Sequence, residues 1–564
     1  EGGAAMAVAD RFGGAMALIL SAGVALSALT AGAFLGAREA ERGEFYGLTM
    51  LAAGGMILLA QATDLLMIFV ALEIMSISTY ALAAYNRRGM RATEAAFKYF
   101  ILGAFSTALF IYGVALVYGA TGGQTGLAQV AAAASDRSLL LMAGLAFVSA
   151  GFFFKVAAAP FHMWTPDVYE GSPTPVTAFM AAGVKAAAFA ALFRVLTVAF
   201  GSESVALHGW MDLVAVLAIA TMVVGNLLAV PQRSVKRMLA YSSIAHAGYL
   251  LAAIAAAAHP EVRAAAGEGL LYYLASYTFM GIGAFAVVAA LERQGGEGPL
   301  AWDLDRFAGL AKVRPALAAA MALFMFSLAG IPPTAGFMGK LVIFRAAVDA
   351  KLYTLAVLGI LTSLVGVYYY LRVVVYMYMR EREPSVGELP APQLTMGGAL
   401  AAAAIGTLIL GIAPGFFGEI ARASALALGP CFGRGFFHAQ KAGHSAPKVG
   451  EELTGAEGPQ KFHDGPSKFR SGGREDLSMR VADDQAAVGA AFAKEGSECR
   501  MTPELGQVED GGVEREGGSE RFGRREILGF VDTESIQSKR DGECTSEIGV
   551  AVHQEKSHRV VPHR

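Results

Sequence analysis

Cysteine is missing from the first 430 residues. All three cysteines, Cys431, Cys499 and Cys544, lie beyond that point. Residues 1–430 therefore have no thiol that could form a disulfide or ligate an iron–sulfur cluster. The chain also lacks a Walker A loop, a dinucleotide-binding fingerprint and an HExxH motif. We therefore expect neither a redox centre nor a bound nucleotide in this chain.

Charge is scarce as well, and it is unevenly spread. Only 16% of the 564 residues are charged, against about 25% in soluble proteins, and the mean hydropathy is +0.48. Residues 431–564 hold 19 of the 45 Lys and Arg and 23 of the 47 Asp and Glu. We predict a membrane domain over residues 1–430 and a polar, disordered tail over 431–564. The net charge of −2, without a basic patch, gives no indication of nucleic-acid binding.

Apolar runs long enough to cross a bilayer as helices, which takes about 20 residues, recur throughout the first 430 residues. Ala, Leu and Gly dominate them, and the alternation of a β-barrel is missing. The sequence therefore predicts an all-α polytopic membrane protein. Twelve spans are predicted, at residues 11–36, 45–62, 64–85, 92–119, 138–164, 173–200, 209–230, 236–258, 268–291, 315–347, 352–379 and 394–416.

Basic residues in the predicted loops alternate between rich and poor. One set of alternate loops carries fourteen Lys and Arg, and the other set carries only Arg137, Arg263 and Lys351. The rich set is predicted to face the cytoplasm. Because the number of spans is even, both chain ends are predicted on the opposite side.

Two of the spans contain prolines that break a helix. The first is "FFFKVAAAPFHMWTPD", with Pro160 just after Lys155, and the second is "LAGIPPTAGFMGK", with Pro332 and Pro333 just before Lys340. Proline removes a backbone donor, and such irregular backbone is tolerated in a membrane where it lines a cavity or is buried in protein. Four intact spans separate the breaks. This pattern is typical of inverted-repeat transporters, with residues 45–200 forming one repeat and 209–379 the other.

Ionisable side chains inside membrane spans are costly and commonly mark ion or proton pathways. The candidates are Glu73, Glu94, Lys98, Lys155, Lys185, His246 and Lys340, with His162 beside the first break and Arg194, Arg345 and Arg372 nearer the span ends.

Each candidate also has a structural interpretation. Glu73 could be a neutral acid bonded to a backbone carbonyl, although partnership with a buried lysine is favoured. Glu94 and Lys98 are four residues apart and can pair on one helical face, and Glu94 could simply lie at the interface. His246 could be an ordinary hydrogen-bonded core residue. The lysines could extend toward the membrane surface, which is difficult for Lys185 because it lies in the middle of its span.

Four stretches resemble the antiporter-like subunits of bacterial NADH–quinone oxidoreductase, which is respiratory complex I. They are residues 64–113, 152–189, 235–251 and 328–344. The segments "LEIMSISTYAL" and "TPDVYEGSP" are similar to subunit N, the counterpart of mitochondrial subunit 2, rather than to its paralogues M and L. Lys340, where subunit M would have Glu, indicates the same branch. The resemblance covers roughly residues 11–420, and residues after about 430 match nothing in the family.

The resemblance implies an inverted-repeat antiporter-like bundle in the bacterial inner (plasma) membrane, crossing it many times. The family has fourteen helices, so the first two are expected to be missing from this chain. The expected partners are other membrane subunits of complex I, including the paralogous antiporter-like subunits. NADH, FMN, iron–sulfur clusters and quinone are expected on partner subunits, with no cofactor or metal in this chain.

Residue roles also follow from the resemblance. Glu73 resembles the glutamate that partners the lysine of the first broken helix, here Lys155. Lys185 resembles the lysine of the following helix in the proton path, and Lys340 resembles the lysine of the second broken helix at the exit half-channel. Glu94 and Lys98 resemble the extra polar pair of subunit N. His246 resembles a relay residue of the family's central axis.

The expected function is proton translocation coupled to electron transfer from NADH to quinone. Burial disfavours the charged form of a lysine and a nearby carboxylate restores it, so a moving charge can load or release a proton. The expected order is Lys155, Lys185, His246 with water, and Lys340. Two alternatives are a monovalent cation/proton antiporter, which needs carboxylate and carbonyl ligands for its cation, and a purely structural membrane scaffold.

Overall fold

The computed structural model of the protein describes residues 5–86, 89–133, 138–201, 208–292, 302–381 and 393–426. These residues form helices, and β-structure within them is limited to isolated bridges. Eleven helices of the described part are long and apolar enough to cross a membrane, which confirms the predicted all-α polytopic fold. The predicted boundary near residue 430 and the predicted disorder of 431–564 lie outside the described residues.

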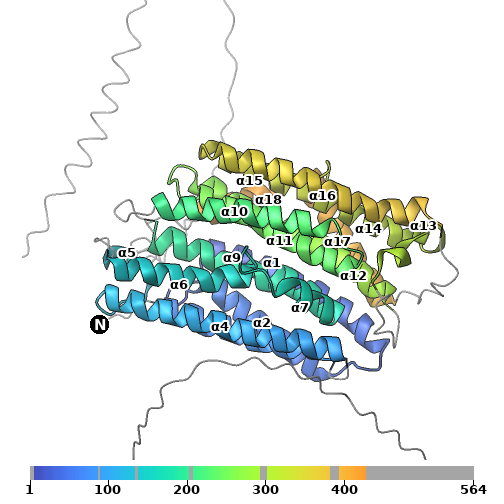
Figure 1. Ribbon diagram of the computed structural model, residues 1–564, viewed down its shortest axis with the longest axis horizontal. Coiled ribbons are helices and arrows are strands. Elements are labelled where there is room, and N and C mark those ends of the chain that lie inside the picture. The colour runs from blue at the N-terminus through green and yellow to red at the C-terminus, as the bar shows by residue number, and fades with distance from the viewer. Residues whose placement is uncertain are drawn as a thin grey trace, which may run out of the picture. The chain divides into compact units, whose positions relative to one another are not determined.

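The first half of the bundle contains α1 to α9 (Figure 1). In chain order the helices are α1 (Arg11–Gly36), α2 (Gly43–Gln61), α3 (Leu65–Ala83), α4 (Met90–Ala120), α5 (Leu127–Ala133), α6 (Leu139–Val156), α7 (Thr165–Gly171), α8 (Thr174–Phe179) and α9 (Lys185–Arg194). The π-helical segment Met180–Val184 joins α8 to α9, and a second, Val195–Ala199, follows α9, so that Thr174–Ala199 is one continuous span.

The second half contains α10 to α18. They are α10 (His208–Ala229), α11 (Val235–Ala256), α12 (Arg263–Leu291), a 3₁₀ turn at Leu304–Phe307, α13 (Leu310–Val313), α14 (Pro315–Ala329), α15 (Ala335–Asp349), α16 (Tyr353–Met379), α17 (Leu394–Ile412) and α18 (Pro414–Leu426). The tenth predicted span, 315–347, is divided into α14 and α15. Helices α5, α13 and α18 were not predicted, because they are shorter than the 20-residue apolar pattern.

Local sequence explains where several helices begin. Asp10 accepts from the backbone N–H of Gly13 at the start of α1, and Asp64 accepts from that of Leu66 at the start of α3. Ser234 caps α11 in the same way. Short oxygen-bearing side chains at these positions satisfy backbone donors that have no partner within the helix.

The core of the bundle is formed by the span Thr174–Ala199 together with α11 and α12. Thr174–Ala199 is wholly buried, and α11 and α12 are nearly so, whereas only about a third of α4, α10 and α16 is covered by protein. The buried span is rich in alanine, and small residues let membrane helices approach closely. Lys185 and His246 are both carried by this core.

Both predicted breaks are present. Helix α6 ends at Val156 and α7 begins at Thr165, so the first broken helix continues to Gly171, beyond its predicted end at residue 164. Helix α14 ends at Ala329 and α15 begins at Ala335. Each first half ends in a left-handed residue, Ala157 (φ 60°) or Gly330 (φ 87°), and each break contains one cis peptide bond before proline.

Lys236, the first residue of the predicted span 236–258, is also counted among the charges of the preceding predicted loop. It lies in the first turn of α11 and is buried, where its Nζ donates to the backbone oxygen of Ser172 at 2.8 Å and lies 4.3 Å from the centre of the Trp302 ring. Arg263, also counted as a loop residue, begins α12. Arg91 and Arg237 of the rich set likewise lie in the first turns of α4 and α11, so the rich set loses more charges than the poor set but still exceeds it.

Candidate proton-path residues

Lys155 is held in the last turn of α6 by α3. It is buried, and its Nζ donates to the Ser76 hydroxyl at 2.8 Å and to the Tyr80 hydroxyl at 3.1 Å. The rings of Tyr80, Tyr99 and Phe154 surround the amine at 5.3 to 5.9 Å. Aromatic faces attract an ammonium group, and the attraction is stronger where water is excluded. The site therefore suits a charged amine without a bonded carboxylate.

Glu73 was expected to partner Lys155, and the two side chains do not form an ion pair in the described structure. Glu73 lies on α3, one helical turn before Ser76, and it accepts from the Thr107 hydroxyl of α4 at 2.8 Å. Ser76 and Tyr80 occupy the hydrogen-bonding positions around the amine instead. Glu73 therefore lies on the helix that binds Lys155 without bonding to the amine itself.

Lys185 follows directly after the π-helical segment Met180–Val184, and such segments are frequent at functional sites. It is buried, and its Nζ donates to the backbone oxygen of Ser243 at 2.7 Å and to the Ser243 hydroxyl. Both acceptors lie on α11. The amine is thereby attached to the helix that carries His246, one turn further along.

His246 contacts two tyrosines. Its Nδ1 is hydrogen-bonded to the Tyr273 hydroxyl of α12, and its Nε2 lies 3.0 Å from the Tyr370 hydroxyl of α16. The imidazole is buried, and each ring nitrogen has a hydroxyl partner that can donate or accept a hydrogen bond. This arrangement is compatible with the relay role and with the structural role that the sequence left open.

A polar chain that the sequence analysis missed continues from Tyr370 toward Lys340. The Tyr369 and Tyr370 rings are 4.4 Å apart, the Tyr369 hydroxyl donates to Asn226 Oδ1 at 3.0 Å, and Asn226 Nδ2 donates to the Tyr249 hydroxyl at 3.1 Å. All four residues are buried. Neutral polar residues were not counted among the candidates, although buried Asn226 within an apolar span was a signal that could have found this chain.

Lys340 completes the polar chain and explains the second break. Its Nζ donates to the backbone oxygens of Leu328 and Ala329, both at 3.0 Å, and to the Ser363 hydroxyl at 2.8 Å, and it lies 5.0 Å from the centre of the Tyr249 ring. The last carbonyls of a helix have no intrahelical partner and carry partial negative charge. The break ends α14 beside Lys340, so these free carbonyls hold the amine.

Glu94 and Lys98 pair as predicted, but they lie apart from the buried lysines. Lys98 Nζ is 2.7 Å from Glu94 Oε1 and 3.0 Å from Asp167 Oδ2. The Lys98 side chain is 41% exposed in the described structure, whereas Lys155, Lys185 and Lys340 are buried. Two carboxylates stabilise its charge.

Among the remaining candidates, Arg194 and Arg372 have structural partners. Arg194 forms a buried two-pronged ion pair with Asp10, Arg372 donates to two backbone oxygens after α10, and Arg345 is largely exposed. His162 lies in the break between α6 and α7, partly buried. Within the described residues, no group of three or more His, Cys, Asp and Glu side chains is arranged to hold a metal ion.

The fold and the lysine-bearing breaks define a class of antiporter-like, multi-pass membrane proteins, and comparisons with known proteins agree. Residues 62–366 match the family model described as NADH:quinone oxidoreductase/Mrp antiporter, TM. The chain is 52% identical over 447 residues to NADH-quinone oxidoreductase subunit N of Myxococcus xanthus (strain DK1622). The matched region covers 74% of this chain and 85% of the relative.

Two solved structures are similar to the described fold. One is a chain of respiratory complex I from Thermus thermophilus with bound aureothin, at 38% identity and a TM-score of 0.63, covering 74% of this chain and 88% of that one. The other belongs to the Mrp complex from Dietzia sp. DQ12-45-1b, with a TM-score of 0.67, 24% identity, and coverage of 75% and 84%. The second likeness shows the fold alone. The chain belongs to the NADH:quinone oxidoreductase/Mrp antiporter family, in its subunit N branch.

Proposed function

We propose that this chain is a proton-translocating membrane subunit of an NADH–quinone oxidoreductase in the bacterial inner membrane. Relatives at this level of identity carry the name of subunit N of that enzyme, and the apolar helices support a multi-pass membrane protein. The chain would act as part of a translocase, with electron transfer occurring on partner subunits. Those partners, which include paralogous antiporter-like subunits, would hold NADH, FMN, iron–sulfur clusters and quinone.

The observation that carries this proposal is the polar chain between Lys185 and Lys340. Ser243 joins Lys185 to α11, His246 follows one turn later, and Tyr370, Tyr369, Asn226 and Tyr249 lead on to the surroundings of Lys340. Buried polar groups are costly unless they are bonded, so such a chain within an apolar core indicates a pathway. Lys155 begins the path in the same repeat as Lys185, with Glu73 adjusting its charge.

Protons would enter at Lys155, pass to Lys185, and reach Lys340 through His246. Each lysine is bound by hydroxyl or carbonyl oxygens, which accept hydrogen bonds from an ammonium and still leave the amine free to lose a proton. The amide of Asn226 holds the Tyr369 and Tyr249 hydroxyls in place but is a poor proton carrier. Water is therefore expected to complete this part of the path.

The first prediction concerns Lys185 and Lys340. Replacing either with Met removes a proton carrier while keeping a side chain of similar length, so proton pumping and coupled electron transfer should both fall to near background. Membranes containing the assembled enzyme would be driven with NADH, and acidification would be recorded together with NADH oxidation. Lys312→Met, at an exposed lysine of α13, is the matched control and should behave as wild type.

Two outcomes would contradict the proposal. Normal pumping and electron transfer in both Met variants would mean that these lysines carry no protons. Na⁺-dependent proton exchange by vesicles containing this chain alone would favour the alternative of a cation/proton antiporter, whose fold it shares.

A further inference from the structure

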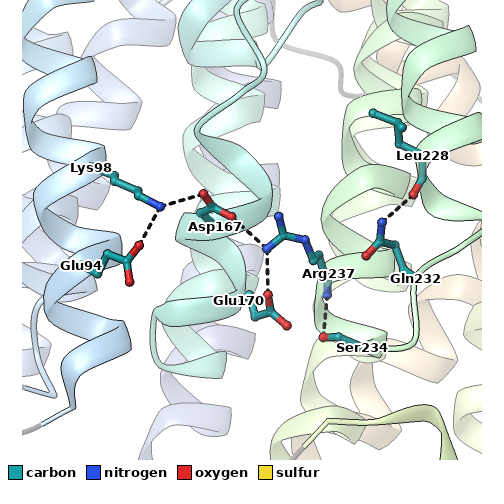
Figure 2. Close-up of polar contacts among 8 residues, drawn as sticks. All are labelled: Glu94, Lys98, Asp167, Glu170, Leu228, Gln232, Ser234 and Arg237. Carbon is teal, nitrogen blue, oxygen red and sulfur yellow. Dashed lines mark hydrogen bonds and ion pairs between the residues drawn. The ribbon is translucent and has the colours of Figure 1, made fainter. Parts of the chain in front are cut away.

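A network of five alternating charges connects three helices outside the proposed path (Figure 2). Lys98 of α4 lies between Glu94, at 2.7 Å, and Asp167 of α7, at 3.0 Å. Arg237 of α11 lies between Asp167, at 2.8 Å, and Glu170, at 2.9 Å. Asp167 is therefore shared by two cations that belong to two different helices.

Asp167 is dispensable for charge balance in this network. Without its charge, Lys98 would still pair with Glu94, and Arg237 would still pair with Glu170. All five side chains are partly exposed, so none is a charge stranded in the core. The contribution that Asp167 alone makes is to connect α4 with α7 and α11.

Helix α7 is attached to α11 by two basic residues. Arg237 binds the carboxylates of Asp167 and Glu170, and Lys236 donates to the backbone oxygen of Ser172 just after the end of α7. On the opposite side, the ion pair of Lys98 with Asp167 is the charged link between α7 and α4 in the described structure. Helix α7 thus has fewer charged links to α4 than to α11.

The contact between α4 and α7 also surrounds Lys155. Tyr99, the residue after Lys98, is buried and stacks on Trp164 at 4.8 Å between ring centres. Trp164 lies directly before α7, and its Nε1 donates to the backbone oxygen of Phe154, the neighbour of Lys155. A small shift of α4 relative to α7 would therefore displace one wall of the lysine site.

Tyr99 reaches the amine by a second route. Its ring meets that of Tyr80 edge-on, with centres 4.6 Å apart, and the Tyr80 hydroxyl accepts from Lys155 Nζ at 3.1 Å. The amine is also 5.9 Å from the centre of the Tyr99 ring itself. The position of α4 accordingly sets both the aromatic surroundings of the amine and the orientation of one of its two hydrogen-bonding partners.

We propose that Asp167 is a positioning residue that, by bridging Lys98 and Arg237, holds α4 against α7 and so maintains the aromatic site of Lys155. This inference rests on the proposed role of Lys155 in the proton path. Asp167 itself carries no proton. When the bridge opens, each cation keeps its other carboxylate, so the link can open and close without leaving a charge unpaired.

The test compares two carboxylates of α7 in the assembled enzyme. Asp167→Asn breaks the bridge, whereas Glu170→Gln removes a carboxylate from the same Arg237 and leaves the bridge intact. A partly exposed ion pair changes an equilibrium by up to about fivefold, so Asp167→Asn should lower NADH-driven pumping per assembled enzyme, and coupled electron transfer with it, by about two- to fivefold. Glu170→Gln should leave both rates unchanged, and Asp167→Glu should restore most of them.

Lys98→Met breaks the same bridge from α4 and should lower both rates as Asp167→Asn does, so it provides the test if Asp167→Asn fails to assemble. Equal pumping rates in Asp167→Asn and Glu170→Gln would overturn the inference. A loss in Lys98→Met alone would also overturn it, since Lys98 would then act by itself. Lys155→Met is measured alongside these variants. Normal pumping in Lys155→Met would refute the proposed path. Lost pumping in Lys155→Met together with normal pumping in Asp167→Asn would refute only the positioning role of Asp167.

Discussion

The buried amines of Lys155, Lys185 and Lys340 are each bound by neutral oxygens, with no carboxylate at ion-pair distance in the described structure. A bonded carboxylate would favour the ammonium form strongly, and breaking such a pair within an apolar core is costly. Hydroxyl and carbonyl acceptors hold the amine less tightly. A change of charge nearby, such as on Glu73, can then shift the proton occupancy of a lysine in the proposed path.

Arg194 shows the contrasting case of a structural buried charge. Its guanidinium contacts both carboxylate oxygens of Asp10, at 2.6 and 3.0 Å, and also donates to the backbone oxygen of Ala60. Asp10 in turn caps α1. The pair joins the start of α1 to α9 and to the end of α2, and its fixed geometry suits anchoring better than proton transfer.

Removing one member of this pair should therefore destabilise the bundle. Arg194→Met leaves the Asp10 carboxylate buried without its cation, and such a loss typically costs about 3–5 kcal/mol. The expected result is a clear fall in the thermal stability of the detergent-solubilised enzyme. Arg345→Met removes an arginine whose side chain is 81% exposed and 3.9 Å from Asp349. Equal stability of the two variants would show that the buried pair is not an anchor.

At the level of elements, the two breaks place helix ends inside the bundle. Proline residues stop α14 before it crosses the membrane, and the freed carbonyls of Leu328 and Ala329 bind Lys340 from α15. The break at Pro160 could likewise be predicted from the sequence, as could the lysine beside it. The short helix α7 could not, because its seven residues carry too little periodicity to distinguish a helix from a loop.

Gly336 is required where α15 crosses the end of α14. A Cβ at this position would lie 1.8 Å from the backbone oxygen of Ser327, so Gly336→Ala should force the two half-helices apart and displace Lys340. Reduced assembly, or loss of pumping in whatever enzyme assembles, is the expected outcome. A membrane fraction with normal amounts and normal pumping would rule out the close crossing.

Gly397 provides the matched control for that substitution. It lies in α17 with nothing within 4 Å of an added Cβ, and alanine in place of a mid-helix glycine is worth about 0.5–1 kcal/mol of stability. Gly397→Ala should therefore assemble at least as well as wild type.

At the level of the whole molecule, the proposed path crosses from one repeat to the other through the buried core. Lys155 belongs to the first repeat and Lys340 to the second, while Lys185 and His246 lie on the enclosed helices between them. Helix α18 closes the described bundle against α12: Ala425 is buried, and a Cβ on Gly267 would lie 2.8 Å from it. The proposed path lies wholly before residue 371.

Two truncations should accordingly behave differently. A chain ending after residue 430 keeps α18 and all proposed path residues, so we expect it to assemble and pump as the full chain does. A chain ending after residue 413 loses α18 and uncovers α12, so its assembly should fall. Native gels of solubilised membranes, followed by pumping assays, would compare them. Loss of pumping in the longer truncation would show that residues 431–564 contribute to function.

The sequence by itself determined the membrane spans, the two breaks and the buried lysines. These depend on local composition: an apolar run, a proline or a charge is visible without knowing what lies beside it. The alternating loop charges likewise predicted an orientation from short-range information alone.

Only the tertiary structure decided which groups meet. Ser76, Ser243 and Ser363 bind the three lysines from other helices, Asn226 links two tyrosines, and Asp167 joins Lys98 to Arg237. Each contact depends on the rotation and axial position of one helix against another, which packing of the whole bundle sets. The same dependence explains why Glu73 and Lys155, both evident in the sequence, do not pair directly.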